Sequence, residues 1–291
     1  MRTVFKSQSG REVVVAPELP TVLIGERINP SGGARKRLTR ALVERNADYI
    51  QQEAIRQIEA GADLIDINVQ AADVQDEPET LAWAVETVAA VVDAPISIDT
   101  NNPDALKLAL QVTPGRALIN SVSGEERSLN AVLPLAAEYN AAVIGLTLDD
   151  NGIPTTAEAR LAVARALMER AASYGLKPED ILIDTLTMSV GADHRAASVS
   201  LNAMRMVREE LGVNLTAGAS NVSFGLPRRE LINTVYLAMA IAMGLNCPIV
   251  NAAKARPAIL AADLLTGRDE YAARFLQDYR REQAAAESGS D

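Results

Sequence analysis

The stretch Pro95-Ile96-Ser97-Ile98-Asp99-Thr100 is a short apolar run that ends in a carboxylate and a hydroxyl. Its length, and the alternation of isoleucine with small or polar residues, are typical of a β-strand. The same pattern, with an acidic, amide or hydroxyl residue at the end, recurs at 62–69, 117–121 and 181–185. Buried strands that all finish in polar groups predict a parallel barrel with a functional rim.

Strand patterns and helix patterns alternate along the whole chain, separated by glycine, proline and capping residues. The expected strands are 21–29, 62–69, 95–100, 116–121, 141–148, 180–185, 214–220 and 248–251. The expected helices are 46–60, 78–92, 102–112, 128–139, 156–174, 197–210, 228–243 and 257–265. This repetition of strand and helix predicts an α/β fold, a (β/α)8 TIM barrel. A doubly wound sheet rarely needs as many units, and no G-x-G-x-x-G turn is present.

The chain is expected to form one domain. Its 291 residues are 48% hydrophobic, which is enough for one large core. We expect a single barrel domain over 1–282, in which 1–20 is an N-terminal extension or hairpin that caps one end. Residues 266–282 are expected to form an outer C-terminal helix, and the small, polar residues 283–291 a disordered tail.

The net charge is −10 and the isoelectric point is near 4.8, which argues against nucleic acid and anionic membranes as partners. The single cysteine, Cys247, excludes an intramolecular disulfide, and its strand position predicts a buried residue. Residues 1–9 lack the apolar core of a signal peptide, and the apolar runs are too short to span a bilayer. We therefore expect a cytoplasmic protein.

Polar residues gather where the expected strands end, and in a closed barrel these ends meet at one mouth. They are mostly acids and amides, a set that suits a neutral ligand with N–H donors and ring acceptors better than a phosphate. Each of them taken alone is equally explained as a cap of a loop or helix. The set comprises Glu26, Asn29, Asp66, Asn68, Asp99, Asn101, Asn120, Ser121, Thr147, Asp149, Asp184, Thr187, Ser220, Asn221 and Asn251.

We expect no bound metal, because one cysteine and one histidine cannot build a thiolate or imidazole site. A Mg²⁺ site made of Asp66, Asp99 and Asp184 is an open alternative. His194 follows the 180–185 strand and is either an acid–base group or a loop hydrogen-bonder. Lys254 and Arg256 follow the last strand, where we expect them to overhang the mouth and bind an acidic part of a ligand.

Seven motifs together resemble those of the pterin-binding, dihydropteroate synthase-like family. More narrowly, they are similar to methyltetrahydrofolate:corrinoid protein methyltransferases, in the same order and spacing over residues 21–270. The motifs are Ile24-Gly25-Glu26-Arg27-Ile28-Asn29, Asp66-Ile67-Asn68-Val69, Ser97-Ile98-Asp99-Thr100-Asn101, Ile119-Asn120-Ser121, Ile144-Gly145-Leu146-Thr147, Gly152-Ile153-Pro154 and Ser220-Asn221-Val222-Ser223.

The resemblance implies a homodimeric barrel that holds methyltetrahydrofolate in its mouth, while cobalamin is carried by a separate corrinoid protein. By the same resemblance, Asp99, Asn120 and Asp184 match positions that bind the pterin ring, and Asn221 matches the amide beside the methyl-bearing nitrogen. Further pterin contacts are expected from Glu26, Asp66, Asn68 and Ser220. The chain has no D-x-H-x-x-G cobalamin signature, which agrees with a corrinoid held by the partner.

Three positions depart from the family pattern. Gln70 stands where a glycine is common, Thr185 replaces a proline, and Phe224-Gly225 follows Ser223 where polar residues are usual. These changes concern the neighbours of the pterin and the identity of the partner more than the fold.

The implied reaction transfers a methyl group between N5 of methyltetrahydrofolate and cobalt, with Asn221 and Asp99 as the catalytic residues. Asn221 would donate a hydrogen bond that strengthens as the carbon–nitrogen bond breaks, and Asp99 or water would deliver the proton. Three alternatives stay open: a dihydropteroate synthase, although 217–227 holds no lysine, a non-catalytic pterin-binding module, and a metal-dependent barrel lyase. The direction of transfer, and tetrahydrofolate against tetrahydromethanopterin, are also open.

Overall fold

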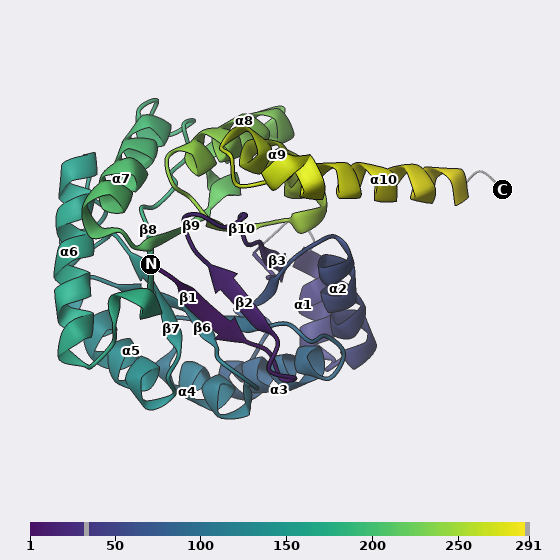
Figure 1. Ribbon diagram of the computed structural model, residues 1–291. Coiled ribbons are helices and arrows are strands. Elements are labelled where there is room, and N and C mark those ends of the chain that lie inside the picture. The colour runs from purple at the N-terminus through teal and green to yellow at the C-terminus, as the bar shows by residue number, and fades with distance from the viewer. Residues whose placement is uncertain (32–34, 289–291) are drawn as a thin grey trace.

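The computed structural model describes residues 1–31 and 35–288, in which parallel strands close into a barrel surrounded by helices (Figure 1). The barrel strands are β3 Ile24–Ile28, β4 Leu64–Ile67, β5 Ile96–Asp99, β6 Leu118–Ser123, β7 Ala142–Leu146, β8 Ile181–Asp184, β9 Asn214–Gly218 and β10 Cys247–Val250. Each strand pairs with the next, and β10 pairs with β3 to close the ring. The predicted TIM barrel is confirmed.

Helices follow the strands and form the outer layer (Figure 1). They are α1 Arg35–Val43, α2 Ala47–Glu59, α3 Glu77–Ala89, α4 Pro103–Val112, α5 Glu126–Glu138, α6 Ala157–Ser173, α7 Ala196–Leu211, α8 Arg229–Ala242 and α9 Ala252–Leu265. Short 3-10 turns are η1 Pro178–Asp180, η2 Ala219–Ser223 and η3 Glu270–Ala272. Asp76, Asn102 and Thr156 cap α3, α4 and α6 by accepting amide hydrogens in the first turn.

The alternation of residues along each strand builds two separate cores. One face packs against the helices, and its isoleucines, such as Ile65 and Ile98, are fully buried there. The other face fills the barrel interior, where Ile24, Leu64 and Leu182 belong to a second cluster. Two residues further along the same strands, the inward positions become polar, so the interior is apolar below and polar at the mouth.

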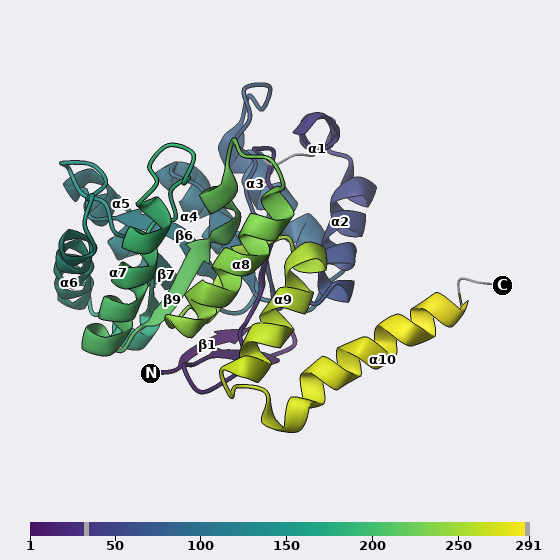
Figure 2. The same cartoon turned by 90° about the horizontal axis from the view of Figure 1, so that it is seen from above.

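An N-terminal hairpin closes the apolar end of the barrel, opposite the mouth (Figure 2). Strands β1 Thr3–Lys6 and β2 Glu12–Val15 pair in antiparallel fashion. Their side chains Phe5 and Val15 are 0% exposed and join the interior cluster. The Asn214 amide of β9 donates to the Val15 carbonyl at 3.0 Å, so the hairpin is fixed to the barrel floor.

Two helices differ from the expected boundaries. Helix α1 was not predicted, because Pro30 and the following glycines indicated a loop; its buried residues Leu38, Ala41 and Leu42 lie at helical spacing. Helix α9 begins at Ala252 rather than at Pro257. The proline lies inside the helix, where it removes one amide donor without ending the helix.

The C-terminal helix α10, Ala273–Ser288, projects away from the barrel (Figures 1 and 2). The expected tail is therefore wrong for residues 283–288, which are helical, and 289–291 lie outside the described residues. Arg256 donates to Asp278 at 2.8 Å and Arg281 donates to the Glu59 carbonyl at 3.1 Å, which anchors the helix to the barrel wall. Across 1–31 and 35–288, the structure contains no helix with the length and apolar character needed to cross a membrane.

Candidate active site

Asp66 is the centre of a hydrogen-bonded group that joins three neighbouring strands at the barrel mouth. The Ser97 hydroxyl of β5 donates to Asp66 Oδ1 at 2.6 Å, and the Asn120 amide of β6 donates to the same oxygen at 3.1 Å. The strand register pairs Asp66 with Ser97, and it pairs Asn120 with Asp99, which lies two residues further along β5. The parallel register therefore makes Asp66 and Ser97 neighbours, and the Asn120 side chain reaches back to join them.

Asp99 lies beside this group and is electrostatically linked to it. Burial is the main cause that raises the pKa of Asp99, and the negative charge of Asp66 raises it further, against a hydrogen bond from the Asn68 amide. Burial also raises the pKa of Asp66, while the bonds from Ser97 and Asn120 oppose the change. Because two adjacent buried carboxylates repel each other, the pair holds a proton to a higher pH than two exposed aspartates would.

Glu26, the middle residue of β3, is a third, largely buried carboxyl group near Asp66. Burial raises its pKa to about 7, partly offset by the charges of Arg27 and Arg229 and by a backbone hydrogen bond from Asn251. Its charge in turn contributes to the raised pKa of Asp66. The mouth therefore has carboxyl groups that exchange protons near neutral pH, which is the range useful for acid–base chemistry.

Asp184 ends β8 and is 7% exposed. Its carboxylate accepts the Leu186 amide hydrogen at 2.7 Å and a further backbone hydrogen bond from Gly218. Burial raises the pKa of Asp184 to about 6, while these two backbone donors and the charge of Arg160 lower it. Two preformed donors hold the carboxylate in a fixed orientation at the mouth.

Asn221 and Ser220 lie on η2, directly after β9. The Ser220 carbonyl accepts from Arg229 at 3.0 Å, which fixes the turn against the start of α8. The Asn221 side chain lies close to Gly218. A β-carbon at that glycine would stand 3.0 Å from the Asn221 amide nitrogen. Among the described residues, no hydrogen bond joins the exposed Asn221 to the Asp66 group, so its amide is available to a ligand.

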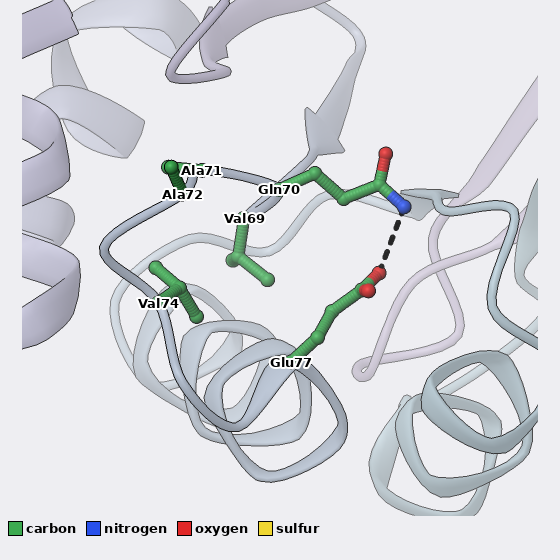
Figure 3. A pocket seen from close by; sticks show the side chains of 6 residues that line it. All are labelled: Val69, Gln70, Ala71, Ala72, Val74 and Glu77. Atoms are coloured by element: carbon green, nitrogen blue, oxygen red, sulfur yellow. Dashed lines mark hydrogen bonds between the residues drawn. The ribbon is translucent and has the colours of Figure 1, made fainter.

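Gln70 and Glu77 link the loops that follow β4 and β5. The Gln70 amide donates to Glu77 at 3.1 Å (Figure 3). It also donates to Asn101 at 2.7 Å. Beside them is a cavity of about 340 Å³, lined by Val69, Gln70, Ala71, Ala72, Val74 and Glu77 (Figure 3). The negative charge of Glu77 also raises the pKa of Asp99, so this loop is electrostatically connected to the mouth.

Some of the predicted mouth residues make hydrogen bonds within the fold instead. Asp149 accepts the Asn151 amide hydrogen at 2.8 Å within its own loop. Thr187 shares a hydrogen bond with the Tyr236 hydroxyl at 2.9 Å, and Thr147 donates to the Asp184 carbonyl at 3.2 Å. A structural role explains these three residues.

The histidine and the two basic residues that were expected near the mouth, His194, Lys254 and Arg256, contact other groups than the mouth carboxyls. The imidazole of His194 is 89% exposed and its nearest charged neighbour is Asp193, at 3.7 Å. Lys254 is paired with Glu230 of α8. The expectation that Arg256 overhangs the mouth is wrong, because its guanidinium binds Asp278 on α10.

The aspartates that were an open alternative for Mg²⁺ do not form a metal site. Within residues 1–31 and 35–288, no group of three or more His, Cys, Asp or Glu side chains is arranged to hold a metal ion. Asp66, Asp99 and Asp184 therefore do not converge on one point. Cys247 is fully buried, and burial raises the pKa of its thiol, as suits an inert core residue.

Ser97 and Glu77 belong to the site, although neither was among the residues predicted for it. Ser97 had a visible signal, because it stands two residues before Asp99 and period-two alternation puts both side chains on one face. Glu77 had no comparable signal, since it lies at the start of a helix and resembles an ordinary acidic residue of a first turn.

The closed parallel barrel makes this chain a TIM-barrel protein. Amides and buried carboxyls lie toward the C-terminal ends of its strands, where proteins of this fold bind small polar ligands. This chain belongs to the pterin binding enzyme family, whose pattern matches residues 25–251. The matched range runs from the first barrel strand to the residue after the last, so it includes the whole mouth. The resemblance inferred from the sequence motifs is confirmed.

Two curated relatives match most of this chain. Methylcorrinoid:tetrahydrofolate methyltransferase from Eubacterium limosum is 30% identical over 265 residues, which cover 89% of this chain and 96% of the relative. Methionine synthase from Mycobacterium tuberculosis is 30% identical over 255 residues, which cover 83% of this chain and 21% of that protein.

Solved structures with the same fold include dihydropteroate synthases. The enzyme from Stenotrophomonas maltophilia has a TM-score of 0.66 and 20% identity, covering 90% of this chain and 98% of that chain. The enzyme from Yersinia pestis has a TM-score of 0.67 and 17% identity, covering 90% and 98%. At this level of identity the likeness concerns the fold alone.

Proposed function

We propose that this protein is a methyltransferase that moves a methyl group between N5 of methyltetrahydrofolate and the cobalt of a corrinoid carried by a separate protein. The observation that carries the proposal is the set of hydrogen-bonded acids and amides on adjacent strands, with Asn221 on a separate turn of the same mouth. The name of the relative from Eubacterium limosum, a methylcorrinoid:tetrahydrofolate methyltransferase, supports the choice of reaction.

The donor set fits a pterin ring. A pterin presents an amino group and a ring N–H as donors, and ring nitrogens and a carbonyl as acceptors, so it needs carboxylates and amides in fixed positions. We assign the ring to Asp99, Asn120 and Asp184. The surrounding contacts are assigned to Glu26, Asp66, Asn68 and Ser220.

Proton supply is the task we assign to Asp99 and Asn221. A tertiary amine leaves carbon readily only when its nitrogen gains a proton or a strengthening hydrogen bond. The raised pKa of Asp99 keeps a proton on this buried carboxyl at neutral pH, either for direct transfer or through one water. Asn221, beside N5, donates the hydrogen bond that increases in strength as the carbon–nitrogen bond breaks.

The corrinoid, supplied by the partner protein, provides the cobalt that accepts or donates the methyl group. Because the corrinoid must approach from outside the barrel, the open mouth has to admit both substrates. The residues of this chain position the pterin and exclude water. The family resemblance further suggests a homodimer, which light scattering on the purified protein would test.

Dihydropteroate synthesis is the second candidate, suggested by the fold neighbours. That reaction releases pyrophosphate and needs cations near the leaving group. In this chain the Arg229 guanidinium is committed to Ser223 at 3.0 Å and to the Ser220 carbonyl, which makes it a poor pyrophosphate ligand. A parallel assay for pteroate formation separates the two functions.

The deciding experiment mixes the protein with methyltetrahydrofolate and free cob(I)alamin without oxygen and follows the cobalt absorption. We expect methylcobalamin to form, and Asn221→Ala to lower turnover by about 10²-fold with little change in folate affinity. The matched control is Asn202→Ala, an exposed asparagine on α7 away from the mouth. Full turnover by Asn221→Ala would refute its role, and absent folate binding by calorimetry would refute the function.

A further inference from the structure

We propose that Arg160 is a positioning residue of the pterin site, which acts through the loop after β8 to orient the Asp184 carboxylate. The proposal rests on the proposed function, since it assumes that Asp184 accepts hydrogen bonds from the pterin. Arg160 lies in the first turns of α6, on the outer layer of the barrel (Figure 1). From its helix position alone it would be taken for a solvated surface residue.

The guanidinium of Arg160 is instead buried among backbone carbonyls. The residue is 3% exposed. Its Nη1 donates to the Thr185 carbonyl at 2.6 Å and to the Leu186 carbonyl at 2.7 Å, and its Nε donates to the Pro154 carbonyl at 3.0 Å. One side chain therefore ties the loop after β7 to the loop after β8.

No carboxylate neutralises this guanidinium by direct contact. Within the described part of the chain, residues 1–31 and 35–288, Arg160 has no ion-pair partner within 4.0 Å. A buried arginine is costly, and neutral carbonyls compensate its charge only in part. Burial lowers the pKa of Arg160, while the negative charge of Asp184 opposes that change. The nearby acid that benefits from the cation is thus Asp184.

Leu186 connects the two side chains. Its backbone has a positive φ of 61°, a left-handed conformation that costs a non-glycine residue about 1 kcal/mol or more. Its amide donates to Asp184 at 2.7 Å, and its carbonyl accepts from Arg160 at 2.7 Å. The guanidinium holds the turn in the conformation that aims this N–H at the carboxylate.

The electrostatic surroundings of Asp184 are simple enough for a pH test. The titratable groups that face it from packed elements are Arg160 of α6 and Tyr236 of α8. Burial raises the pKa of Tyr236, so its hydroxyl stays neutral and Arg160 is the only one of the two that carries charge near neutral pH. Removing the cation should raise the pKa of Asp184. When the pH is lowered, Asp184 should then take up its proton at a higher pH, and pterin affinity should be lost from that pH downward.

The test measures binding of methyltetrahydrofolate by calorimetry from pH 5 to 8 in the wild type, Arg160→Met and Arg160→Lys. We expect Arg160→Met to weaken binding about tenfold at pH 7 and to move the pH midpoint of affinity upward by about one unit. Arg160→Lys keeps the charge but lacks the planar fork, so it should keep the midpoint while binding about threefold more weakly.

The matched control is Arg116→Met. Arg116 is also a mostly buried arginine that donates to backbone carbonyls, those of Val4 and Asn140, and it pairs with Asp180 near the N-terminal hairpin. Its loss should lower the thermal midpoint of unfolding without changing the pH midpoint of binding. If Arg160→Met behaves in the same way, Arg160 is only a structural clamp and the proposal is wrong.

A second comparison decides the matter even if Arg160→Met does not fold. In an Asp184→Asn background, Arg160→Lys should cause no further loss of affinity, because the group it positions is already changed. Equal losses in both backgrounds would overturn the proposal. If the wild type itself fails to bind methyltetrahydrofolate, the proposed function fails instead, so the two failures are distinguishable.

Discussion

Glu26→Gln should make the stability of the ligand-free protein less sensitive to a rise in pH from about 4.5 to 7. A carboxyl group whose pKa is higher in the folded state than in the unfolded chain keeps its proton longer when folded. Between those two pKa values the native state binds more protons, so the free energy of unfolding falls as pH rises. Glu26 has a folded pKa of about 7 against an ordinary value of 4.5, which places the window between about pH 4.5 and 7.

The size of the effect follows from the same values. One pKa unit corresponds to about 1.4 kcal/mol, so the shift of Glu26 amounts to about 3 kcal/mol across the window. Because the side chain is partly exposed and its charge is linked to that of Asp66, we expect about 2 kcal/mol in practice. Glutamine keeps the shape and can still accept the backbone hydrogen bond from Asn251.

The assay is urea unfolding at pH 5, 6, 7 and 8 for the wild type and Glu26→Gln, with Asn202→Ala as a surface control. Stability of the wild type should fall across this range, and Glu26→Gln should lose about 2 kcal/mol less between pH 5 and 8. Curves that stay parallel would mean that the folded environment does not favour the protonated form, and the argument about the buried mouth would fail.

Three other substitutions test separate parts of the structure. Gly218→Ala should place a β-carbon against the Asn221 amide and lower methyl-transfer turnover more than stability, as seen by comparing assay rates with thermal melts. Ser97→Ala removes the 2.6 Å bond to buried Asp66 and should cost about 1–3 kcal/mol in urea unfolding; an unchanged midpoint would contradict this. Phe5→Ala empties the barrel floor and should cost about 3–5 kcal/mol, while a loss below about 1 kcal/mol would show that the hairpin is not a necessary part of the core.

The fold was predictable because its two determinants are local. Apolar runs of strand length recur between helical segments, and their number closes a barrel. The pairings of Asp66 with Ser97 and of Asp99 with Asn120 follow once the strands are parallel and in register, whereas the bond from Asn120 back to Asp66 depends on its side chain. What remained uncertain were segments with mixed signals, such as α1 after a glycine-rich turn and α9 with Pro257 in its interior.

The parts that were not predictable depend on the path of distant chain segments. Arg256 follows the last strand and was expected at the mouth. Its guanidinium instead pairs with Asp278, which α10 brings next to it. Arg160 occupies a helix position typical of a surface residue and is buried only because two loops place their carbonyls around it. No local pattern encodes either contact, because each partner lies on a different structural element.

The stability of the barrel and the chemistry of its mouth are linked through the same strands. Leu64, Ile24 and Leu182 stand two residues before a mouth carboxyl and fill the interior with apolar groups. This apolar layer, closed below by the hairpin, supports a barrel that also carries carboxyls largely removed from water above, where burial raises their pKa. Neutral isosteres of those carboxyls would relieve the cost of a buried charge in the empty barrel, yet they would remove the titratable groups that we assign to the pterin. The destabilising carboxyls are therefore the feature of this barrel that packing alone does not explain, and the proposed ligand does.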